Sequence, residues 1–407
     1  MGSHITVIGA GVVGATTALR LVEQGYTVSL VDQAHALAQG ASGANGAQLS
    51  YNYTDAMASP DTLKSLPKLL LGLDLSFRFS PRIDLEFIRW GAEFIRNSTL
   101  AKSDQNTLAI LQIALSSRSV MQEWDHRYGF EYQKTAAQKL HLYESESALE
   151  KAKRRVELKN AQGATQQVID RKRVLELEPA LQKMNANLVG AVYSPDDEVG
   201  DVIAFTKAAI EKTLSLGAGK LHLSTTISDI VVEQGKCKAL VSNHGNLDTD
   251  AVVICAGYQS SSLARKLGVK IRPIIPVAGY SLTFPDTEFT PKISLTDTPN
   301  KIVLCHLGNQ LRVAGMADVG RVAASPPEHR IEQLKQLLIK RFPAAGDYHT
   351  SATPWAGMRP MTSDSRPVIK QTALDNVFIN SGHGMLGWTL AAGSAQKLTN
   401  LLVKKIN

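Results

Sequence analysis

The stretch Ile5-Thr-Val-Ile-Gly-Ala-Gly-Val-Val-Gly14 is a β-branched run that leads directly into a glycine-rich turn. Apolar residues then recur at helical spacing as far as Val22, Gly25 provides a stop, and Thr27–Val31 is a second apolar run. This order predicts a strand, a helix and a second, parallel strand. The GxGxxG spacing at the turn from strand to helix is the fingerprint of a dinucleotide-binding unit.

The three glycines of this turn have different tasks. Gly9 permits the tight turn, Gly11 lets the backbone approach a pyrophosphate, and Gly14 allows close packing of the helix, whose N-terminus faces the negative charge. Asp32 stands at the end of the second strand, about 20 residues further on, where its carboxylate accepts hydrogen bonds from a ribose diol. A carboxylate there disfavours a 2′-phosphate and therefore NADP. We expect contacts to the dinucleotide from Gly9, Gly11, Val12, Val13, Gly14, Asp32 and Gln33.

The fingerprint alone leaves NAD and FAD open, and the next segments favour FAD. Residues 41–48, Ala41-Ser-Gly-Ala-Asn-Gly-Ala-Gln48, are small and polar, which suits a backbone that passes beside phosphates or a ring. The chain then enters mainly helical patterns from residue 61 to about residue 158, whereas simple NAD enzymes continue with another strand and helix. We expect further cofactor contacts from Ser42, Asn45 and Gln48.

The middle of the chain alternates between two groups of strands. A second sheet is predicted to contain residues 140–143, 190–193, 277–284, 301–304 and 310–315. An amphipathic helix and four strands return to the nucleotide-binding part, at residues 202–216, 220–223, 227–232, 238–241 and 251–255. Small residues follow the last of these strands and again allow a close approach, and we expect cofactor contacts from Ile230, Ala256 and Gly257.

Four glycines and a histidine gather near the end of the chain, in Ser381-Gly-His-Gly-Met-Leu-Gly-Trp-Thr-Leu-Ala-Ala-Gly-Ser394. A strand at residues 376–380 precedes this stretch and an Ala/Leu-rich helical pattern continues it. This order of strand, glycine turn and helix is the same as in the first fingerprint. A second helix N-terminus is therefore available to stabilise partial negative charge.

Composition excludes several classes of protein. The chain has 407 residues, 44% hydrophobic and 20% charged, which is typical of a globular protein with two or three sizeable cores. Its net charge is +7, yet the basic residues are scattered and no nucleic-acid patch is predicted. Three distant cysteines indicate neither a disulfide framework nor a metal site, and they favour a cytoplasmic setting. The leucine-rich segment 66–79 is expected to be a buried helix, a lid or a membrane-surface contact.

The combined motifs resemble the D-amino acid dehydrogenase family, small-subunit type, within the superfamily of FAD enzymes that contains D-amino acid oxidase and glycine oxidase. The resemblance extends over nearly the whole chain. The motifs that carry it are Gly9/Gly11/Gly14, Asp32, Ser42 with Asn45 and Gln48, Gly279-Tyr-Ser281, Arg312-Val-Ala-Gly-Met316, Trp355-x-Gly-x-Arg-Pro-x-Thr-x-Asp364 and Gly382-His-Gly-x-x-Gly-Trp-Thr389.

This resemblance implies an α/β fold in which a glutathione-reductase-like, Rossmann-type FAD domain interleaves with an α+β substrate domain built on a mixed sheet. We expect residues 1–55, 198–268 and 351–407 to form the first domain, and residues 56–197 and 269–350 the second. The final glycine stretch is implied to press against the flavin, through Gly382, His383, Gly384, Met385, Gly387, Trp388 and Thr389.

The resemblance also implies which residues meet the substrate. Arg359 of the Gly-x-Arg-Pro motif would bind the substrate carboxylate as a planar fork, and a structural salt bridge with Asp364 is the alternative. Tyr53 and Tyr280 are candidates for pocket walls or hydroxyl donors, and His383 for a hydrogen bond or a steric role near the flavin.

The expected activity is oxidation of D-amino acids by FAD, with electrons passed to a quinone or another electron-transfer partner and no metal involved. D-proline, D-hydroxyproline, glycine and sarcosine oxidation and a cyanide-forming glycine enzyme stay open as alternatives. So do a flavin subunit that needs a partner for turnover and, more distantly, an NAD dehydrogenase. The resemblance further implies a cytoplasmic protein at the inner face of the membrane, with segment 66–79 as its contact.

Overall fold

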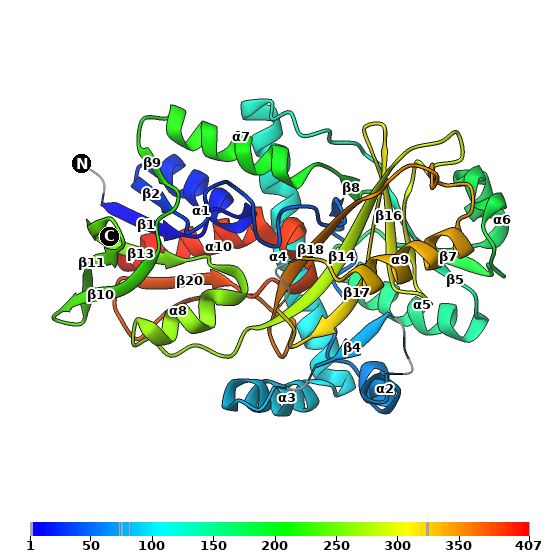
Figure 1. The fold of residues 1–407 in the computed structure, drawn as a ribbon, viewed down its shortest axis with the longest axis horizontal. Helices are drawn as coiled ribbons and strands as arrows, with labels where there is room; N and C mark the ends of the chain where they lie inside the picture. The colour runs from blue at the N-terminus through cyan, green and yellow to red at the C-terminus, as the bar shows by residue number, and fades with distance from the viewer. Residues whose placement is uncertain (1–2, 73, 75, 81, 323–324, 407) are drawn as a thin grey trace.

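Strands from distant parts of the chain meet in two large sheets at opposite ends of the molecule (Figure 1). The computed structural model describes residues 3–72, 74, 76–80, 82–322 and 325–406. One sheet has six strands in the order β19-β20-β13-β1-β2-β9, and the other has nine strands. Two small sheets, β10-β11-β12 and β3-β8, complete the set within these residues.

The six-stranded sheet contains the βαβ unit that the sequence predicts. Strand β1 pairs in parallel with β2, with Ile5 opposite Val28, and with β13 on its other side. Only the edge strand β19 runs antiparallel, to β20. The strands are β1 (His4–Ile8), β2 (Thr27–Val31), β9 (Gly219–His222), β13 (Ala251–Ile254), β19 (Val368–Gln371) and β20 (Val377–Ser381).

Helices cover one face of this sheet, and a small sheet covers the other. The interior of the helical layer is apolar and includes Leu19, Trp124, Phe205 and Leu398. Its helices are α1 (Val12–Glu23), α4 (Leu100–Tyr128), α7 (Val202–Ser215) and α10 (Gly387–Ile406). The opposite side carries β10 (Ile227–Glu233), β11 (Lys236–Ser242), β12 (Gly245–Asp248), η2 (Gly257–Gln259) and α8 (Ser260–Lys266).

The nine-stranded sheet is mixed and has the order β18-β14-β17-β16-β15-β5-β7-β6, with β4 beside β17. Its strands are β4 (Phe77–Phe79), β5 (Lys139–Tyr143), β6 (Gln167–Asp170), β7 (Gly190–Ser194), β14 (Ile275–Pro285), β15 (Ser294–Asp297), β16 (Ile302–Leu307), β17 (Gln310–Val319) and β18 (Thr353–Met361). Short elements around it are β3 (Gln48–Leu49), β8 (Glu198–Val199), α5 (Glu146–Asn160), α6 (Arg171–Leu177), η1 (Pro179–Lys183) and α9 (Glu328–Arg341).

Strand β18 belongs to a different sheet from the one that the predicted domain boundaries imply. The predicted boundary puts residues 351–407 with the cofactor-binding part, but β18 pairs antiparallel with β14 along nine residues and is an edge strand of the nine-stranded sheet. The chain therefore returns to the six-stranded sheet only at β19. This pairing places the Gly-x-Arg-Pro motif in the second sheet, facing the first.

The leucine-rich segment combines several structures. Helix α2 (Pro60–Leu70) covers its first part and β4 its last three residues, while residues 73 and 75 lie outside the described part of the chain. Helix α3 (Leu85–Asn97) follows, and both helices project at the lower edge of the molecule in Figure 1. No helix in the described ranges is both long and apolar enough to cross a membrane.

Candidate active site

A single cavity of about 1190 Å³ extends between the two large sheets. Its walls come from the β1–α1 turn, the loop 41–48, the segment 380–389 and the inner surface of the nine-stranded sheet. The volume exceeds the range of about 300–1000 Å³ that is usual for small-molecule sites. The cavity has room for a large cofactor together with a small substrate.

The β1–α1 turn forms a glycine cradle at one end of the cavity. Gly9 has φ +112°, and a side chain there would meet the carbonyl oxygen of Cys255. A side chain at Gly14 would overlap the carbonyl oxygen of Gly9, so the helix packs directly on the turn. Gly11 is the N-cap of α1 and offers no side-chain cap, which leaves N–H groups of the first helical turn to a ligand.

The carboxylate of Asp32 lies beside this cradle. It accepts hydrogen bonds from the backbone N–H groups of Ala10 at 2.6 Å and Ala34 at 2.8 Å. Two carboxylate oxygens have about four acceptor positions, so capacity remains for the hydroxyls of a ribose.

The loop 41–48 is fixed to the nine-stranded sheet through its own backbone. Ser281 donates to the carbonyl oxygen of Ala44 at 2.7 Å, and Arg312 donates to that of Asn45 at 3.3 Å. The side chain of Asn45 accepts from the N–H of Ala47, which has a positive φ of 57°. Ser281 and Arg312 therefore position the loop and do not themselves line the cavity.

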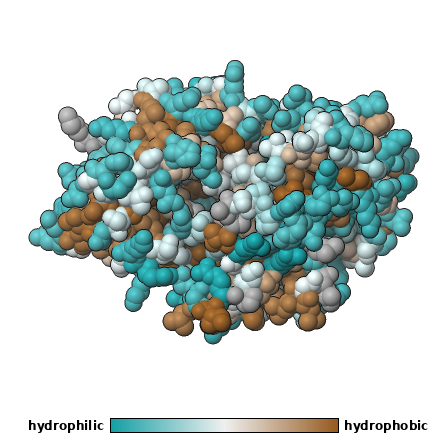
Figure 2. Space-filling model, in the orientation of Figure 1, coloured by the Kyte–Doolittle hydropathy of each residue, from teal (hydrophilic) through white to brown (hydrophobic). Residues whose placement is uncertain are grey.

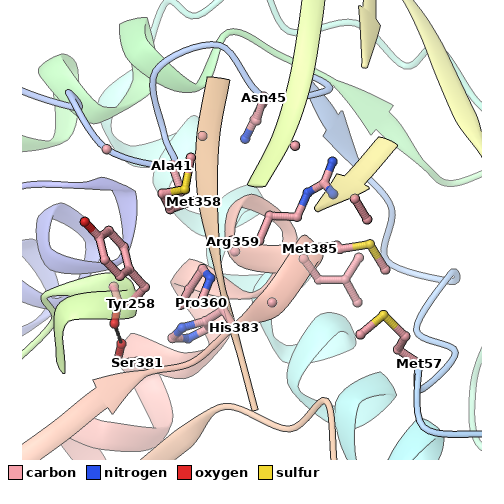
Figure 3. A pocket seen from close by; sticks show the side chains of 18 of the residues that line it. Ala41, Asn45, Met57, Tyr258, Met358, Arg359, Pro360, Ser381, His383 and Met385 are labelled. Carbon is pink, nitrogen blue, oxygen red and sulfur yellow. Dashed lines mark hydrogen bonds between the residues drawn. The ribbon is translucent and has the colours of Figure 1, made fainter. Parts of the chain in front are cut away.

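Arg359 projects from β18 toward the side of the pocket that holds Met57 and Met385 (Figure 3). Its guanidinium lies directly over Gly279 on the neighbouring strand β14, where any side chain would overlap it. Nη1 donates to the carbonyl oxygen of Met316 at 2.8 Å, which fixes the orientation of the fork.

The alternative of an Arg359–Asp364 salt bridge is wrong. Asp364 pairs with Arg272, and Arg359 has no ion pair with a carboxylate in the described part of the chain. Burial lowers the pKa of Arg359 to about 10, so the side chain stays protonated at neutral pH. Asp318 acts on this guanidinium from a distance but forms its salt bridge with Arg330, so the fork of Arg359 stays open to an anionic ligand.

The two tyrosines differ in what their hydroxyls can do. Tyr53 lies against His141, with ring centroids 4.0 Å apart, and its hydroxyl makes no hydrogen bond to the described residues. Burial raises its pKa, so the phenol is neutral and available to a ligand. Tyr280 also lines the cavity, but its hydroxyl donates to Asp318 at 2.8 Å. Tyr280 is therefore a wall and not a free donor.

His383 is buried in the turn before α10. Its Nε2 lies 2.9 Å from the hydroxyl of Ser394, and burial lowers its pKa to about 3. The imidazole is neutral at physiological pH. Its role as a hydrogen-bonding and steric element is consistent with this geometry, whereas a proton-transfer role is not supported.

The glycines of this turn serve packing as well as access. Gly382 has φ +80° and a side chain there would meet Thr362, while a side chain at Gly384 would meet Met361. Gly387 has only one neighbour, at an ordinary contact distance, so packing of the chain does not explain it. It begins α10 on the cavity wall, where a close approach of a ligand would need a glycine.

Most of the predicted site residues meet at this cavity. Those that line it are Gly9, Gly11, Val12, Val13, Asp32, Gln33, Ser42, Asn45, Gln48, Tyr53, Ala256, Gly257, Tyr280, Arg359, His383, Gly384, Met385, Gly387, Trp388 and Thr389. Those that do not line it are Gly14, Ile230 and Gly382. Ile230 lies in β10 and packs on the far side of the six-stranded sheet, while Thr225, Thr226 and Ile227 reach the cavity instead.

Sequence analysis missed two contributions to the cavity wall. The aromatic residues Phe87, Trp90 and Phe94 come from α3, and Lys139 comes from β5. The helical spacing of the aromatic residues could have indicated an inner face of α3. Lys139 alternates with Leu140 in its strand, a pattern that usually places the polar residue in water.

The residues present fit an FAD molecule. The glycine cradle, the carboxylate of Asp32 and the helix start at Gly387 lie along one cavity. A side chain at Gly9 or Gly14 would clash with a carbonyl oxygen, so the turn keeps the close backbone approach that a pyrophosphate needs.

Comparison with known proteins decides the family. A family model described as FAD dependent oxidoreductase matches residues 4–401. The chain belongs to this family. The Gly9-x-Gly-x-x-Gly14 turn, Asp32 and the α10 turn all lie within the matched residues.

Relatives of this FAD dependent oxidoreductase include D-amino acid dehydrogenases from Rhizobium rhizogenes and Vibrio cholerae. The first is 33% identical over 400 residues, which cover 98% of this chain and 95% of the relative. The second is 32% identical over 401 residues, which cover 98% and 94%. L-proline dehydrogenase from P. horikoshii has the same fold, with a TM-score of 0.76 at 19% identity, covering 99% of this chain and 94% of the other. Glycine oxidase from Geobacillus kaustophilus also has a TM-score of 0.76, at 18% identity, with 99% and 95% covered.

Proposed function

We propose that this protein is an FAD-dependent D-amino acid dehydrogenase. Relatives of that name, about one third identical over nearly full length, support the reaction. The observation that carries the proposal to this chain is Arg359, a half-buried guanidinium without a salt bridge to a carboxylate among the described residues, on the wall of the cavity. An α-amino acid offers the planar carboxylate that such a fork binds in two parallel hydrogen bonds.

Bound FAD would supply the acceptor for the hydride of the substrate Cα; the imino acid product would then be hydrolysed by water to a 2-oxo acid and ammonia. Arg359 holds the carboxylate and limits rotation of the substrate, and the carbonyl oxygen of Met316 keeps the guanidinium in place. Tyr53 offers a neutral hydroxyl to the bound substrate. Positioning of this kind contributes a large part of the rate of a unimolecular transfer.

The amino group has to be neutral before the hydride leaves, and the site supplies no histidine for this step. His383 is held to Ser394 and is neutral because of burial. The proton of the ammonium group is therefore lost to solvent as the substrate enters, and the side chains act by orientation.

The test is an anaerobic absorbance spectrum of the purified protein before and after addition of D- and L-amino acids. The panel contains D-alanine, D-proline, glycine and sarcosine. The likeness to L-proline dehydrogenase and glycine oxidase concerns the fold alone, so it does not decide among these substrates. Bleaching of the flavin band by D-isomers and not by L-isomers supports the proposal. Bleaching by L-isomers, or a flavin that no D-amino acid reduces, contradicts it.

The electron acceptor is proposed to be a quinone of an adjacent membrane. Eight of the fourteen exposed large hydrophobic side chains in the described residues lie between residues 63 and 100, and they colour the lower edge of Figure 2. Ile83 is 100% exposed, Leu85 85% and Leu71 73%, so exposed apolar side chains concentrate in this segment. We call it the α2–α3 surface. Its members are Leu63, Leu70, Leu71, Ile83, Leu85, Ile88, Ile95 and Leu100.

A bilayer with anionic headgroups fits the α2–α3 surface. Lys64, Lys68 and Arg96 are exposed around it and make no ion pair with the described residues, so they complement negative lipid charge. The inner face of α3 lines the FAD cavity through Phe87, Trp90 and Phe94. An apolar acceptor thus has a path from the bilayer along α3 to the cavity. The proposed contact is wider than residues 66–79, and α3 contributes three of its eight members.

A further inference from the structure

Lys139 is a buried cation that the substrate site leaves unexplained. It lies in β5, its side chain is 2% exposed, and it lines the FAD cavity. Burial of an ammonium group carries a large desolvation cost, which proteins usually offset with a carboxylate. No carboxylate makes an ion pair with Lys139 in the described ranges, and the buried carboxylate of Asp197 acts on it only from beyond ion-pair distance.

Neutral groups hold the ammonium in one place. Nζ donates to Oε1 of Gln48 at 2.7 Å and to Oγ of Ser50 at 2.7 Å, and it lies 5.0 Å from the ring centroid of Tyr53. Gln48 is fixed in turn, because its Nε2 donates to Ser294 at 2.6 Å. Lys139 therefore keeps its charge at a defined point of the wall, where its pKa is lowered by burial to about 8.

The position of Lys139 separates it from the carboxylate-binding arginine. The two strands are five positions apart in the order β18-β14-β17-β16-β15-β5. Arg359 already supplies the cation for the substrate carboxylate, so the charge of Lys139 is available to another occupant of the cavity.

A short chain of hydrogen bonds connects Lys139 to the start of α10. Lys139 donates to Ser50, and the N–H of Ser50 donates to Oγ1 of Thr389 at 3.0 Å. Thr389 belongs to the first turn of α10, which begins on the cavity wall and whose N-terminus carries partial positive charge. Two sources of positive potential thus lie together on the FAD side of the cavity.

We propose that Lys139 is a positioning charge for the flavin, which stabilises reduced FAD relative to oxidised FAD. Transfer of a hydride moves a proton and two electrons from the substrate to the flavin, which gains one negative charge. A fixed ammonium group interacts more strongly with the charged state than with the neutral one, and it does so without reorganisation. This inference rests on the proposed function and deepens it, because it concerns how readily the same site takes electrons from an amino acid.

The test is the two-electron midpoint potential of the FAD-bound protein, measured against a reference dye. Lys139→Met and Lys139→Gln remove the charge, and we expect the equilibrium constant for flavin reduction to fall at least about tenfold, which is about 30 mV. Lys139→Arg keeps the charge and should retain the wild-type potential. The matched control is Lys159→Met, because Lys159 is also 2% exposed but pairs with Asp55 and does not line the cavity.

Three results would overturn the inference. The first is a wild-type potential in both Lys139→Met and Lys139→Gln. The second is an equal shift in Lys159→Met, since the effect would then belong to any buried positive charge near Tyr53 and not to the place of Lys139. The third is loss of oxidised FAD from the Lys139 variants, because a charge that acts on the reduced state does not hold the oxidised one. The measurement uses no amino acid, so a flavin that D-amino acids fail to reduce would count against the proposed function alone.

Discussion

The guanidinium of Arg359 lies across the backbone of Gly279, in the space that a side chain at residue 279 would need. In the ladder between β18 and β14, Arg359 is opposite Val277, so Gly279 is its diagonal neighbour. The arginine thus lies flat against the sheet and its fork faces the cavity. Residue 279 controls the position of a group to which it makes no hydrogen bond.

We expect Gly279→Ala to weaken substrate binding without loss of FAD. The added methyl group displaces the guanidinium from Met316 and from the substrate carboxylate. Loss of charged hydrogen bonds of about 1.5–3 kcal/mol corresponds to a KM increase of about tenfold to 150-fold. Steady-state kinetics and the ratio of flavin to protein absorbance test this. Gly91→Ala in α3 is the control, because a side chain there has no neighbour within 4 Å, and a similar KM increase in it would contradict the argument.

Arg359→Lys separates charge from geometry. The lysine keeps the positive charge but loses the planar fork, so we expect KM for amino acids to rise strongly while flavin content stays unchanged. Titration of the FAD-bound enzyme with amino acids, followed by flavin absorbance, gives the affinity directly. Unchanged kinetics would remove Arg359 from the substrate site.

Patterns among neighbouring residues were sufficient to predict the βαβ unit of the first sheet and one end of the cavity. The βαβ unit from β1 to β2 is confirmed because its turn, helix and strands are determined by nearby residues. Segments 41–48 and 381–389 were expected to lie at one site, the second because of the family resemblance, and both line the cavity.

Contacts between distant residues were harder to predict. Asp364 is close to Arg359 in the chain, yet on the fold it pairs with Arg272, because side chains in β18 and in the turn after it point in different directions. Lys139 and His141 alternate with leucines as if they faced water, but the cavity and α4–α5 region cover that face and both are buried. Spacing alone does not show that both faces of a strand are covered.

The α2–α3 surface should bind vesicles that contain anionic phospholipid. We expect the double change Ile83→Ser and Leu85→Ser to lower the partition coefficient at least about tenfold, because each buried apolar side chain contributes about 1.5–3 kcal/mol. Sedimentation with anionic and with neutral vesicles measures this. Leu216→Ser is the control, since Leu216 is 43% exposed at the end of α7, away from this surface. Equal sedimentation of the double variant and the wild-type protein would argue against a bilayer contact there.

Burial of neutral His383 should make the protein sensitive to acid. Its folded-state pKa is about 3, below the value of about 6.5 for an unfolded chain, so the folded state binds fewer protons at low pH. The stability that depends on this residue is fully present above about pH 6.5 and is lost as the pH falls below it. At pH 5 the expected cost is about 2 kcal/mol relative to pH 7.

Urea unfolding of wild-type protein and of His383→Gln at pH 7 and pH 5, at equal FAD concentration, tests this directly. Glutamine keeps a polar group near Ser394 but does not titrate, so the variant should lose less stability between the two pH values, by about 2 kcal/mol. The difference between variant and wild type reports the contribution of His383 alone, because His141, the other histidine whose pKa burial lowers, is present in both proteins. The exposed His244→Gln serves as the control and should keep the wild-type dependence. An identical loss of stability in His383→Gln and in the wild-type protein would contradict this prediction, because it would mean that protonation of the buried His383 has no energetic cost.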